Sequence, residues 1–197
     1  MGRIKQSFQR GERSWWKVIR RLLILAVLLW LGWLALKAHY YQDVSTCFKK
    51  GNGSVADTIY YITIHHDAIP QDKEVDLADI DKFHSEIRKW SCGFAYHYYI
   101  TKNKIFKISF DKQSRAHVAN NNRYNIGICL HGDFDHEQPT LQQQFLLICL
   151  VNKLVINYKI KFENIKRHRD WDGQNGTHCC GEQFNFEGFT KYLVRYE

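Results

Sequence analysis

The sequence has little of what marks several common protein classes. It contains two Pro and 12 Gly among 197 residues, which excludes collagen-like and proline-rich chains. No segment repeats with a period of 20–50 residues, so solenoids and propellers are excluded as well. Hydrophobic residues make up 45% of the chain and aromatic residues 15%, which is enough for a packed core. The length suits one globular domain plus one additional segment.

Basic residues are in excess only near the N-terminus. Residues 1–38 carry eight Lys or Arg and a single acid, Glu12, whereas the remaining residues carry 20 basic and 19 acidic side chains. The net charge of +8 is therefore a property of the N-terminal segment. A nucleic-acid-binding surface needs clustered basic residues, and no such cluster follows Lys37. We expect no nucleic-acid partner.

The one long hydrophobic run directly follows this basic segment. Leu22–Leu36 is uncharged and would span about 22 Å as a helix, short of the ~30 Å bilayer core unless Tyr40 and Tyr41 extend it. We expect a basic cytoplasmic tail at 1–21, a transmembrane signal-anchor at 22–41, a linker at 42–56 and a globular domain at 57–197. The positive-inside rule places that domain outside the inner membrane, in the periplasm. A cleaved signal peptide and a buried or interfacial helix are the alternatives.

Beyond residue 57 the hydrophobic pattern alternates between strand and helix periods. It predicts strands at 58–66, 94–100, 105–110 and 126–130, and helices at 76–90, 140–158 and 186–196. Thr140 and Gln143 form a capping box at the start of the long helix. The residues of this helix that we expect to face inward are Phe145, Ile148, Cys149 and Val155. The order of elements predicts an α/β domain with a central mixed β-sheet flanked by helices.

Five of the six cysteines divide into two groups, and the sixth, Cys179, is treated with the histidines below. Cys129 and Cys149 lie in apolar runs, where a buried and inert thiol is expected. Cys47, Cys92 and Cys180 are candidates for disulfides in an oxidising compartment. The sequence does not choose a pairing among them.

Histidine is frequent, with eight of the ten between His65 and His168. His65 ends a predicted strand in ITIHH, His168 lies in IKRHRDW, and Cys179 lies in GTHCCGE. Two imidazoles and one thiolate can bind Zn²⁺ and leave the fourth tetrahedral position open, as in catalytic zinc sites. From chemistry alone, His65 at a strand end is more often a hydrogen-bonded structural residue, and the spacing is not that of a zinc finger.

Five segments in order carry a more specific signal: ITIHH, FAYHYYI, AHVANNNRYNIGICLHGDF, IKRHRDW and THCCG. Together they resemble the zinc-dependent N-acetylmuramoyl-L-alanine amidase family, which includes phage lysozyme-type amidases and peptidoglycan recognition proteins. The resemblance covers about residues 58–190. It implies a mixed sheet flanked by helices, with zinc in a groove on one face. The implied reaction is hydrolysis of the amide bond between N-acetylmuramic acid and L-alanine in peptidoglycan or a muropeptide.

The resemblance also implies roles for individual residues. His65, His168 and Cys179 match the three zinc ligands. Tyr96 matches the Tyr that faces the reacting water and the scissile carbonyl, and Thr177 matches the Lys or Thr that assists there. We expect both to be catalytic.

Other positions are assigned less directly. We expect His117 and Asn125 to be substrate-binding residues, and a surface role for His117 is the alternative. His66 and His97 alternate with His65 and Tyr96 along their strands, so we expect them to pack on the opposite face.

The sequence departs from the family pattern at a few positions. Cys180 stands where the family has Pro, so either of two adjacent thiols could bind the metal, although the register favours Cys179. Asp67 replaces the usual Thr after the His pair, and Ala95 replaces a Gly. The alternative functions are a membrane-anchored, non-catalytic peptidoglycan-binding module and a structural or regulatory envelope protein. The complete ligand set favours the enzyme, because binding members of the family have typically lost a ligand.

Overall fold

The computed structural model of the protein describes residues 19–24, 27–28, 38–48, 54–172 and 177–196. The chain divides into two compact units, residues 1–40 and 41–197. The described residues of the first unit are helical. Among the described residues, no helix is both long enough and apolar enough to cross a membrane. Most of Leu22–Leu36 lies outside the described residues, so the signal-anchor stays a prediction.

Six strands form one mixed sheet in the second unit, in the order β1-β4-β3-β5-β2-β6. The strands are β1 (Tyr41–Asp43), β2 (Tyr61–His66), β3 (Tyr98–Ile100), β4 (Ile105–Lys107), β5 (Asn125–Leu130) and β6 (Ile165–Arg167). Neighbouring strands are parallel except β3 and β4, which pair antiparallel. The predicted mixed sheet is confirmed.

The centre of the sheet is the parallel pair β2 and β5. Their register runs from Tyr61 opposite Asn125 to His66 opposite Leu130. All residues of β5 and the last five residues of β2 are buried. Parallel strands covered on both faces are expected to be apolar along their whole length, so the buried His65 and His66 at the end of β2 are exceptions that need partners.

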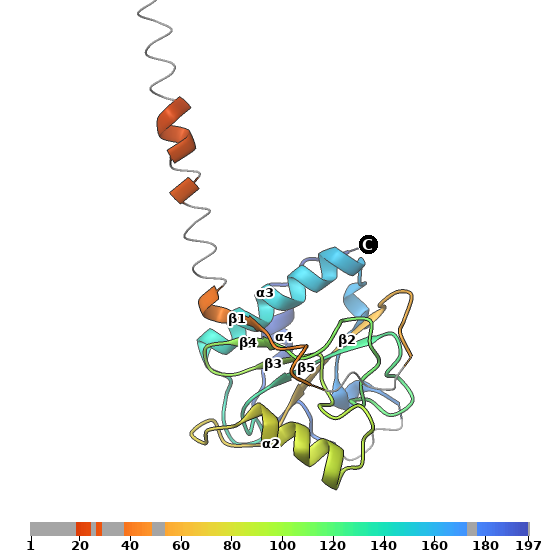
Figure 1. Ribbon diagram of the computed structural model, residues 1–197. Helices are drawn as coiled ribbons and strands as arrows, with labels where there is room; N and C mark the ends of the chain where they lie inside the picture. Colours follow the sequence, from red (N-terminus) through yellow and green to blue (C-terminus); the bar gives the residue numbers. More distant parts are fainter. Residues whose placement is uncertain (1–18, 25–26, 29–37, 49–53, 173–176, 197) are drawn as a thin grey trace, which may run out of the picture. The chain divides into compact units, whose positions relative to one another are not determined.

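Helices cover both faces of the sheet, and Figure 1 shows α2 and α3 on opposite sides of it. The helices are α2 (Leu77–Lys82), the π-helical turn η1 (Phe83–Ile87), α3 (Leu141–Tyr158), the 3₁₀ turns η2 (Phe162–Asn164) and η3 (His168–Asp170), and α4 (Phe186–Thr190). The helix predicted at 76–90 thus changes to a π-helical turn after Lys82. Asp76 caps α2, because its side chain accepts a hydrogen bond from the backbone N of Ala78.

The long helix α3 begins as predicted but is rotated from the expected face. Thr140 and Gln143 form the capping box, and Val155 is buried. Phe145, however, is 60% exposed and Cys149 is exposed, so these two predictions were wrong. Apolar residues surround most of this helix, and a stripe rich in leucine packs on the sheet instead. That stripe is Leu146, Leu147, Leu150, Val151 and Leu154.

All six cysteines lie in the described part of the chain, and none is in a disulfide in this structure. Cys129 is buried, as predicted, whereas the exposed Cys149 is not the buried thiol that we expected. Among the candidates for pairing, Cys47 is exposed, and Cys92 and Cys180 are buried.

The segment expected to be a linker at 42–56 belongs in part to the globular unit. Tyr41–Asp43 forms β1 beside β4, and the N–H of Val44 donates to the carbonyl of Lys107 at 2.9 Å. Further on, Ala56 is 2% exposed and its N–H donates to the carbonyl of Lys112 at 2.8 Å. Because Val44 pairs with the sheet and Ala56 with the turn at Lys112, the globular unit begins at Tyr41 rather than at residue 57.

Candidate metal centre and groove

Three separate segments bring His65, His168 and Cys179 together. His65 lies near the end of β2, and His168 begins η3 directly after β6. Since β2 and β6 are parallel neighbours, their carboxyl ends meet at the same edge of the sheet. Cys179 is added by the turn that follows, where its carbonyl accepts a hydrogen bond from the N–H of Arg169 at 2.9 Å. One donor atom from each of the three side chains lies within 4.8 Å of the others.

The spacing of these donor atoms is close to that of a tetrahedral zinc site. Nδ1 of His65 is 3.7 Å from Sγ of Cys179, and the rings of His65 and His168 are 4.7 Å apart between centroids. Zinc–nitrogen and zinc–sulfur bonds imply donor–donor separations of roughly 3.3–3.6 Å. A small closing movement would bring the three donors to this geometry.

The protonation of the donors also suits a metal. Burial lowers the pKa of His65 well below its ordinary value, and His117 and His168 lower it further. Its imidazole is therefore neutral and keeps a lone pair for a metal. Burial raises the pKa of Cys179 to about 12, so a cation is needed to hold the thiolate form. A neutral His65 imidazole, the second imidazole of His168 and a thiol that a cation can deprotonate fit Zn²⁺.

The adjacent thiol is placed differently. Cys180 is 1% exposed, and the donor cluster of the described residues contains Cys179 rather than Cys180. An ion pair supports this turn: Nη1 of Arg169 lies 2.9 Å from Oε1 of Glu182. A second ion pair, between Arg167 and Asp170 at 2.8 Å, holds η3.

Tyr96 and Thr177 lie next to the donor cluster. The ring of Tyr96 is 5.1 Å from that of His65 between centroids. Burial raises the pKa of Tyr96 well above its ordinary value, and the neighbouring Cys129 raises it further, so the hydroxyl stays protonated and can donate a hydrogen bond. Oγ1 of Thr177 accepts a hydrogen bond from the N–H of Cys179 at 3.3 Å, which helps to fix the turn that presents the thiol.

The two residues expected to bind substrate are inside the protein. His117 is 5% exposed and Asn125 is 1% exposed. Asn125 accepts a hydrogen bond from Oγ1 of Thr63 and donates one to the carbonyl of Asn121, each at 3.0 Å. The prediction that these side chains contact substrate does not fit their burial; instead, Asn125 fixes a loop, and His117 contacts His65 at 3.1 Å. His97 is buried and packed as expected.

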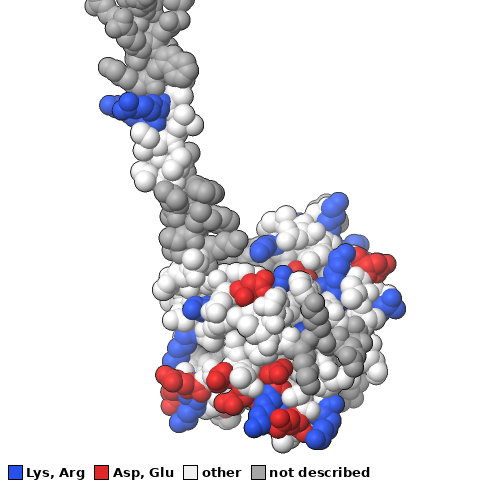
Figure 2. Space-filling model, in the orientation of Figure 1, with Lys and Arg blue, Asp and Glu red and all other residues white. Residues whose placement is uncertain are grey.

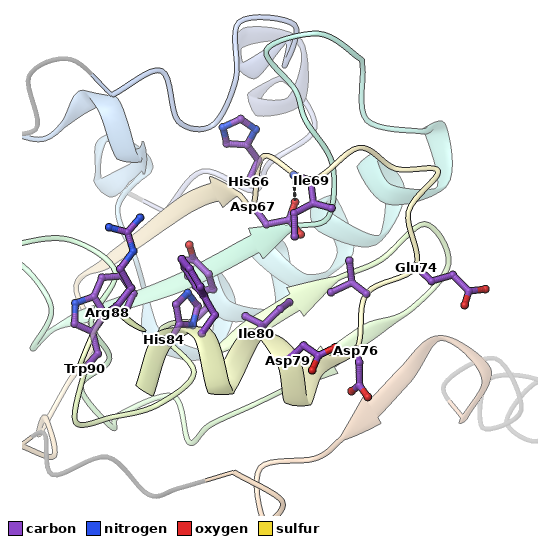
Figure 3. Close-up of a pocket in the computed structure, with 13 residues that line it drawn as sticks. His66, Asp67, Ile69, Glu74, Asp76, Asp79, Ile80, His84, Arg88 and Trp90 are labelled. Carbon is purple, nitrogen blue, oxygen red and sulfur yellow. Dashed lines mark hydrogen bonds between the residues drawn. The ribbon is translucent and has the colours of Figure 1, made fainter. Parts of the chain in front are cut away.

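A groove of about 480 Å³ opens beside Tyr96 and His66. Figure 3 shows Arg88 and Trp90 at one end of it and Glu74 and Asp76 at the other. Its wall also includes the apolar Ile69, Val75, Ile80 and Phe83 and the acidic Asp67 and Asp79. The groove therefore offers a positive end and a negative end, with apolar and polar side chains along its wall. Elsewhere, Figure 2 shows basic and acidic side chains intermixed on the visible face of the globular unit.

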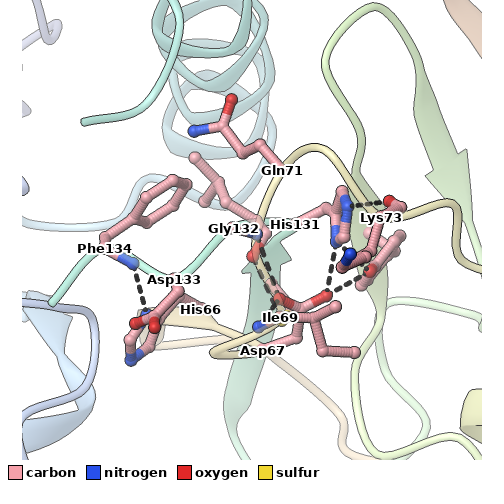
Figure 4. A network of polar contacts seen from close by, with 12 residues as sticks. His66, Asp67, Ile69, Gln71, Lys73, His131, Gly132, Asp133 and Phe134 are labelled. Atoms are coloured by element: carbon pink, nitrogen blue, oxygen red, sulfur yellow. Dashed lines mark hydrogen bonds and ion pairs between the residues drawn. The ribbon is translucent and has the colours of Figure 1, made fainter. Parts of the chain in front are cut away.

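A charged network buttresses one wall of this groove (Figure 4). Oδ2 of Asp67 accepts hydrogen bonds from Nδ1 of His131 at 2.9 Å and from the hydroxyl of Tyr99. Nε2 of His131 donates to the carbonyl of Lys73 at 3.0 Å. Burial alone would lower the pKa of His131, but the hydrogen bond and charge of Asp67 outweigh it and raise this pKa. His131 thus donates from both ring nitrogens and ties the loop after β2 to the end of β5.

Sequence reasoning missed this network, although a signal for it exists. His66 and Leu130 are opposite each other at the ends of parallel strands. The next residue of each strand is Asp67 and His131, so the register alone places a carboxylate beside an imidazole. In the family motif, Asp67 stands out only as a replacement for the usual Thr.

Comparison with known proteins agrees with this geometry. Residues 56–182 match the model of the N-acetylmuramoyl-L-alanine amidase family, and the chain belongs to that family. No curated protein matches the chain.

Solved structures of similar proteins include both lytic enzymes and recognition proteins. The N-acetylmuramoyl-L-alanine amidase LysC from Clostridium intestinale is 29% identical with a TM-score of 0.62, covering 77% of this chain and 95% of its own. Drosophila PGRP-LB is 20% identical with a TM-score of 0.62, covering 80% and 98%. Peptidoglycan recognition protein-LE, solved in complex with tracheal cytotoxin, a monomeric diaminopimelic acid-type peptidoglycan, is 22% identical with a TM-score of 0.62, covering 78% and 95%. The last two likenesses concern the fold.

Proposed function

We propose that the protein is a zinc-dependent N-acetylmuramoyl-L-alanine amidase, which hydrolyses the amide bond between N-acetylmuramic acid and L-alanine in peptidoglycan. The observation that carries this proposal is the cluster of His65, His168 and Cys179, whose donor atoms lie within 4.8 Å. Family membership over residues 56–182 supports the same reaction.

The three ligands would hold Zn²⁺ with one coordination position open. Zinc bound there supplies Lewis acidity and lowers the pKa of water towards about 7. His65 and His168 contribute neutral nitrogens, so only the Cys179 thiolate offsets the charge of the cation. A site of this charge remains strongly electrophilic.

Tyr96 would stabilise the charge that develops on the scissile carbonyl oxygen. Its raised pKa keeps the hydroxyl proton in place, so the group donates a hydrogen bond instead of presenting a second negative charge. Thr177 would support the same oxygen, because an oxygen that accepts a bond from the N–H of Cys179 can still donate its own hydrogen.

The groove beside Tyr96 would hold the substrate. Its positive end at Arg88 suits a carboxylate of the peptide stem, and its negative end at Glu74 and Asp76 suits an amine. Apolar lining residues such as Ile80 would contact the aliphatic parts of the stem. Recognition proteins of this fold bind muropeptides, as the complex of peptidoglycan recognition protein-LE illustrates.

The amidase is tested by mass spectrometry of muropeptides after the full-length, zinc-loaded protein in detergent has been incubated with intact peptidoglycan. We expect free stem peptides with a new amino terminus on L-alanine. The matched control is Cys179→Ala, which should lose both zinc and products. Unchanged peptidoglycan with zinc confirmed in the protein would refute the amidase and favour the non-catalytic binding module. Full activity of Cys179→Ala without zinc would refute the metal site.

We also propose that the segment from residue 22 to residue 40, which ends where Tyr41 begins β1, anchors the enzyme in the inner membrane with the globular unit outside. The support is the uncharged run Leu22–Leu36 behind a basic segment. Protease added to intact spheroplasts should digest the globular unit and leave the N-terminal tail protected. Digestion only after lysis would contradict this topology.

A further inference from the structure

His117 is buried beside the metal centre and has no part in the groove. Its ring lies between two partners: Nδ1 is 3.1 Å from Nε2 of His65, and Nε2 is 3.1 Å from the carbonyl oxygen of Asn125. Its ring stands nearly perpendicular to that of His65, with 5.2 Å between the centroids. A continuous hydrogen-bonded chain therefore runs from a predicted zinc ligand through His117 to the backbone of β5.

The chemistry of the two ends fixes the direction of this chain. A carbonyl oxygen only accepts, so the Nε2 of His117 must carry a hydrogen. The buried ring meets a carbonyl oxygen on one side and another imidazole on the other; a cationic ring there would lack a charged partner, so Nδ1 is the acceptor. The hydrogen between the two rings must then belong to Nε2 of His65. In a neutral His65 this leaves the lone pair on Nδ1, which is the atom 3.7 Å from Sγ of Cys179.

The position of His117 is built into the fold. Gly127 lies under its ring, and a Cβ at that position would be 2.7 Å from Cγ of His117. The N–H of His117 donates to Oδ1 of Asn122 at 3.0 Å. Asn125, which supplies the terminal carbonyl, is itself held through Thr63 at 3.0 Å. The ring thus has little freedom to turn away from His65.

We propose that His117 is a positioning residue of the metal centre, which holds His65 in the tautomer and orientation that present Nδ1 to the metal. Histidine ligands of metals commonly donate their second N–H to a fixed acceptor, which orients the ring and raises its basicity. Here the acceptor is another imidazole anchored on the backbone. The inference rests on the proposed function, since it assumes that His65 binds zinc.

The test compares zinc affinity in three variants of the full-length protein in detergent, by competition with a chelating dye. His117→Leu removes the acceptor, and we expect the Kd for zinc to rise about 10- to 100-fold. His117→Gln keeps an acceptor oxygen and should restore most of the affinity. The matched control is His97→Leu, because His97 is equally buried and its ring packs edge-on against His117, 5.7 Å away between centroids. Its hydrogen bonds to described residues are to backbone groups, the N–H of Gly127 and the carbonyl of Gln113. Its zinc Kd should change less than about threefold, with a comparable loss of thermal stability in the metal-free form.

A second measurement does not depend on the folding of any variant. In ¹⁵N-labelled, metal-free wild-type protein, NMR of the histidine rings should show hydrogens on Nε2 of both His65 and His117. A hydrogen on Nδ1 of His65 would overturn the inference, as would unchanged zinc affinity in His117→Leu or an equal loss in His97→Leu. A wild-type protein that binds no zinc would instead refute the proposed function, and the inference would fall with it.

Discussion

His117 and His131 are both buried, both flank β5, and both contact the end of β2 or the residue after it, yet their pKa values move in opposite directions. The pKa of His117 is lowered and that of His131 is raised. The difference lies in what each ring meets. His117 ends on a backbone carbonyl and faces another imidazole, whereas His131 faces the carboxylate of Asp67. Burial alone favours the neutral ring, and only a charged partner reverses this.

The contrast assigns different work to the two networks. A neutral chain keeps lone pairs available, which a metal centre requires. A charged pair supplies cohesion between the loop after β2 and the end of β5, and it offers no free lone pair on His131. The end of β2 thus contributes His65 to the donor cluster, and the residue after it, Asp67, forms a structural ion pair with His131.

The largest expected effect is a loss of catalytic rate, at a residue that belongs neither to the His117 network nor to the His131 network. Tyr96→Phe removes the hydroxyl and leaves the ring against His65, so we expect kcat to fall about 10²- to 10³-fold, as for loss of one oxyanion donor. The zinc Kd and thermal stability should match those of the wild type. Kinetics on a soluble muropeptide would measure the fall in kcat. A drop in zinc content would show that Tyr96 supports the metal instead.

Breaking the charged network should cost more stability than breaking the neutral one. Asp67→Asn removes the charge that His131 faces, and we expect the free energy of unfolding to fall by about 3 kcal/mol, at the low end for a buried ion pair because the imidazole can lose its proton. Zinc affinity should change little. Denaturant unfolding with parallel zinc titration measures both quantities, and a large loss of zinc affinity would show that the networks are coupled.

The neutral network consists of His65, His117 and the carbonyl of Asn125. A larger side chain at Gly127 should push the ring of His117 out of this network. Gly127→Ala would place a Cβ 2.7 Å from Cγ of His117, and we expect a loss of roughly 2 kcal/mol of stability together with weaker zinc binding. The same substitution in a His117→Ala background should add little further cost, since the ring is gone. Additive losses in the double variant would mean that the overlap is not with His117.

The smallest effect is on pH dependence. The folded pKa of His131 is raised, so its contribution to stability is complete below the unfolded value near 6.5 and is lost as pH rises through the folded value. We expect stability to decline above about pH 6.5 by no more than about 1.4 kcal/mol per pH unit. His131→Gln should flatten this slope. An unchanged slope in that variant would assign the decline to another group.

The sequence was sufficient for the elements with strong local patterns and for the residues in motifs. The β-branched run before His65 and the capping box at Thr140 both lie where expected. The three proposed ligands, separated by up to 114 positions, lie together as the family resemblance implied. The order of the five motifs identified these three ligands, whereas the spacing between them along the chain matches no metal-binding pattern by itself.

Other features depend on contacts that no local pattern encodes. Phe145 and Cys149 were expected inside because α3 is apolar on more than one side, and only packing against the sheet selects the buried face. The pairing of Asp67 with His131 follows from the register of β2 and β5, and the burial of His117 follows from the packing of its ring over Gly127. His117 was assigned to the groove because its motif does not report which way the ring points.

The edge strand β1 has a consequence for how the globular unit can be isolated. Tyr41–Asp43 pairs with Ile105–Lys107 and occupies the outer hydrogen-bonding edge of β4. A fragment that starts at residue 57 would leave that edge bare, and a bare edge is a template for another chain. Such a fragment would tend to self-associate during purification. A fragment that starts upstream of Tyr41 would keep β1 and so keep the edge of β4 covered.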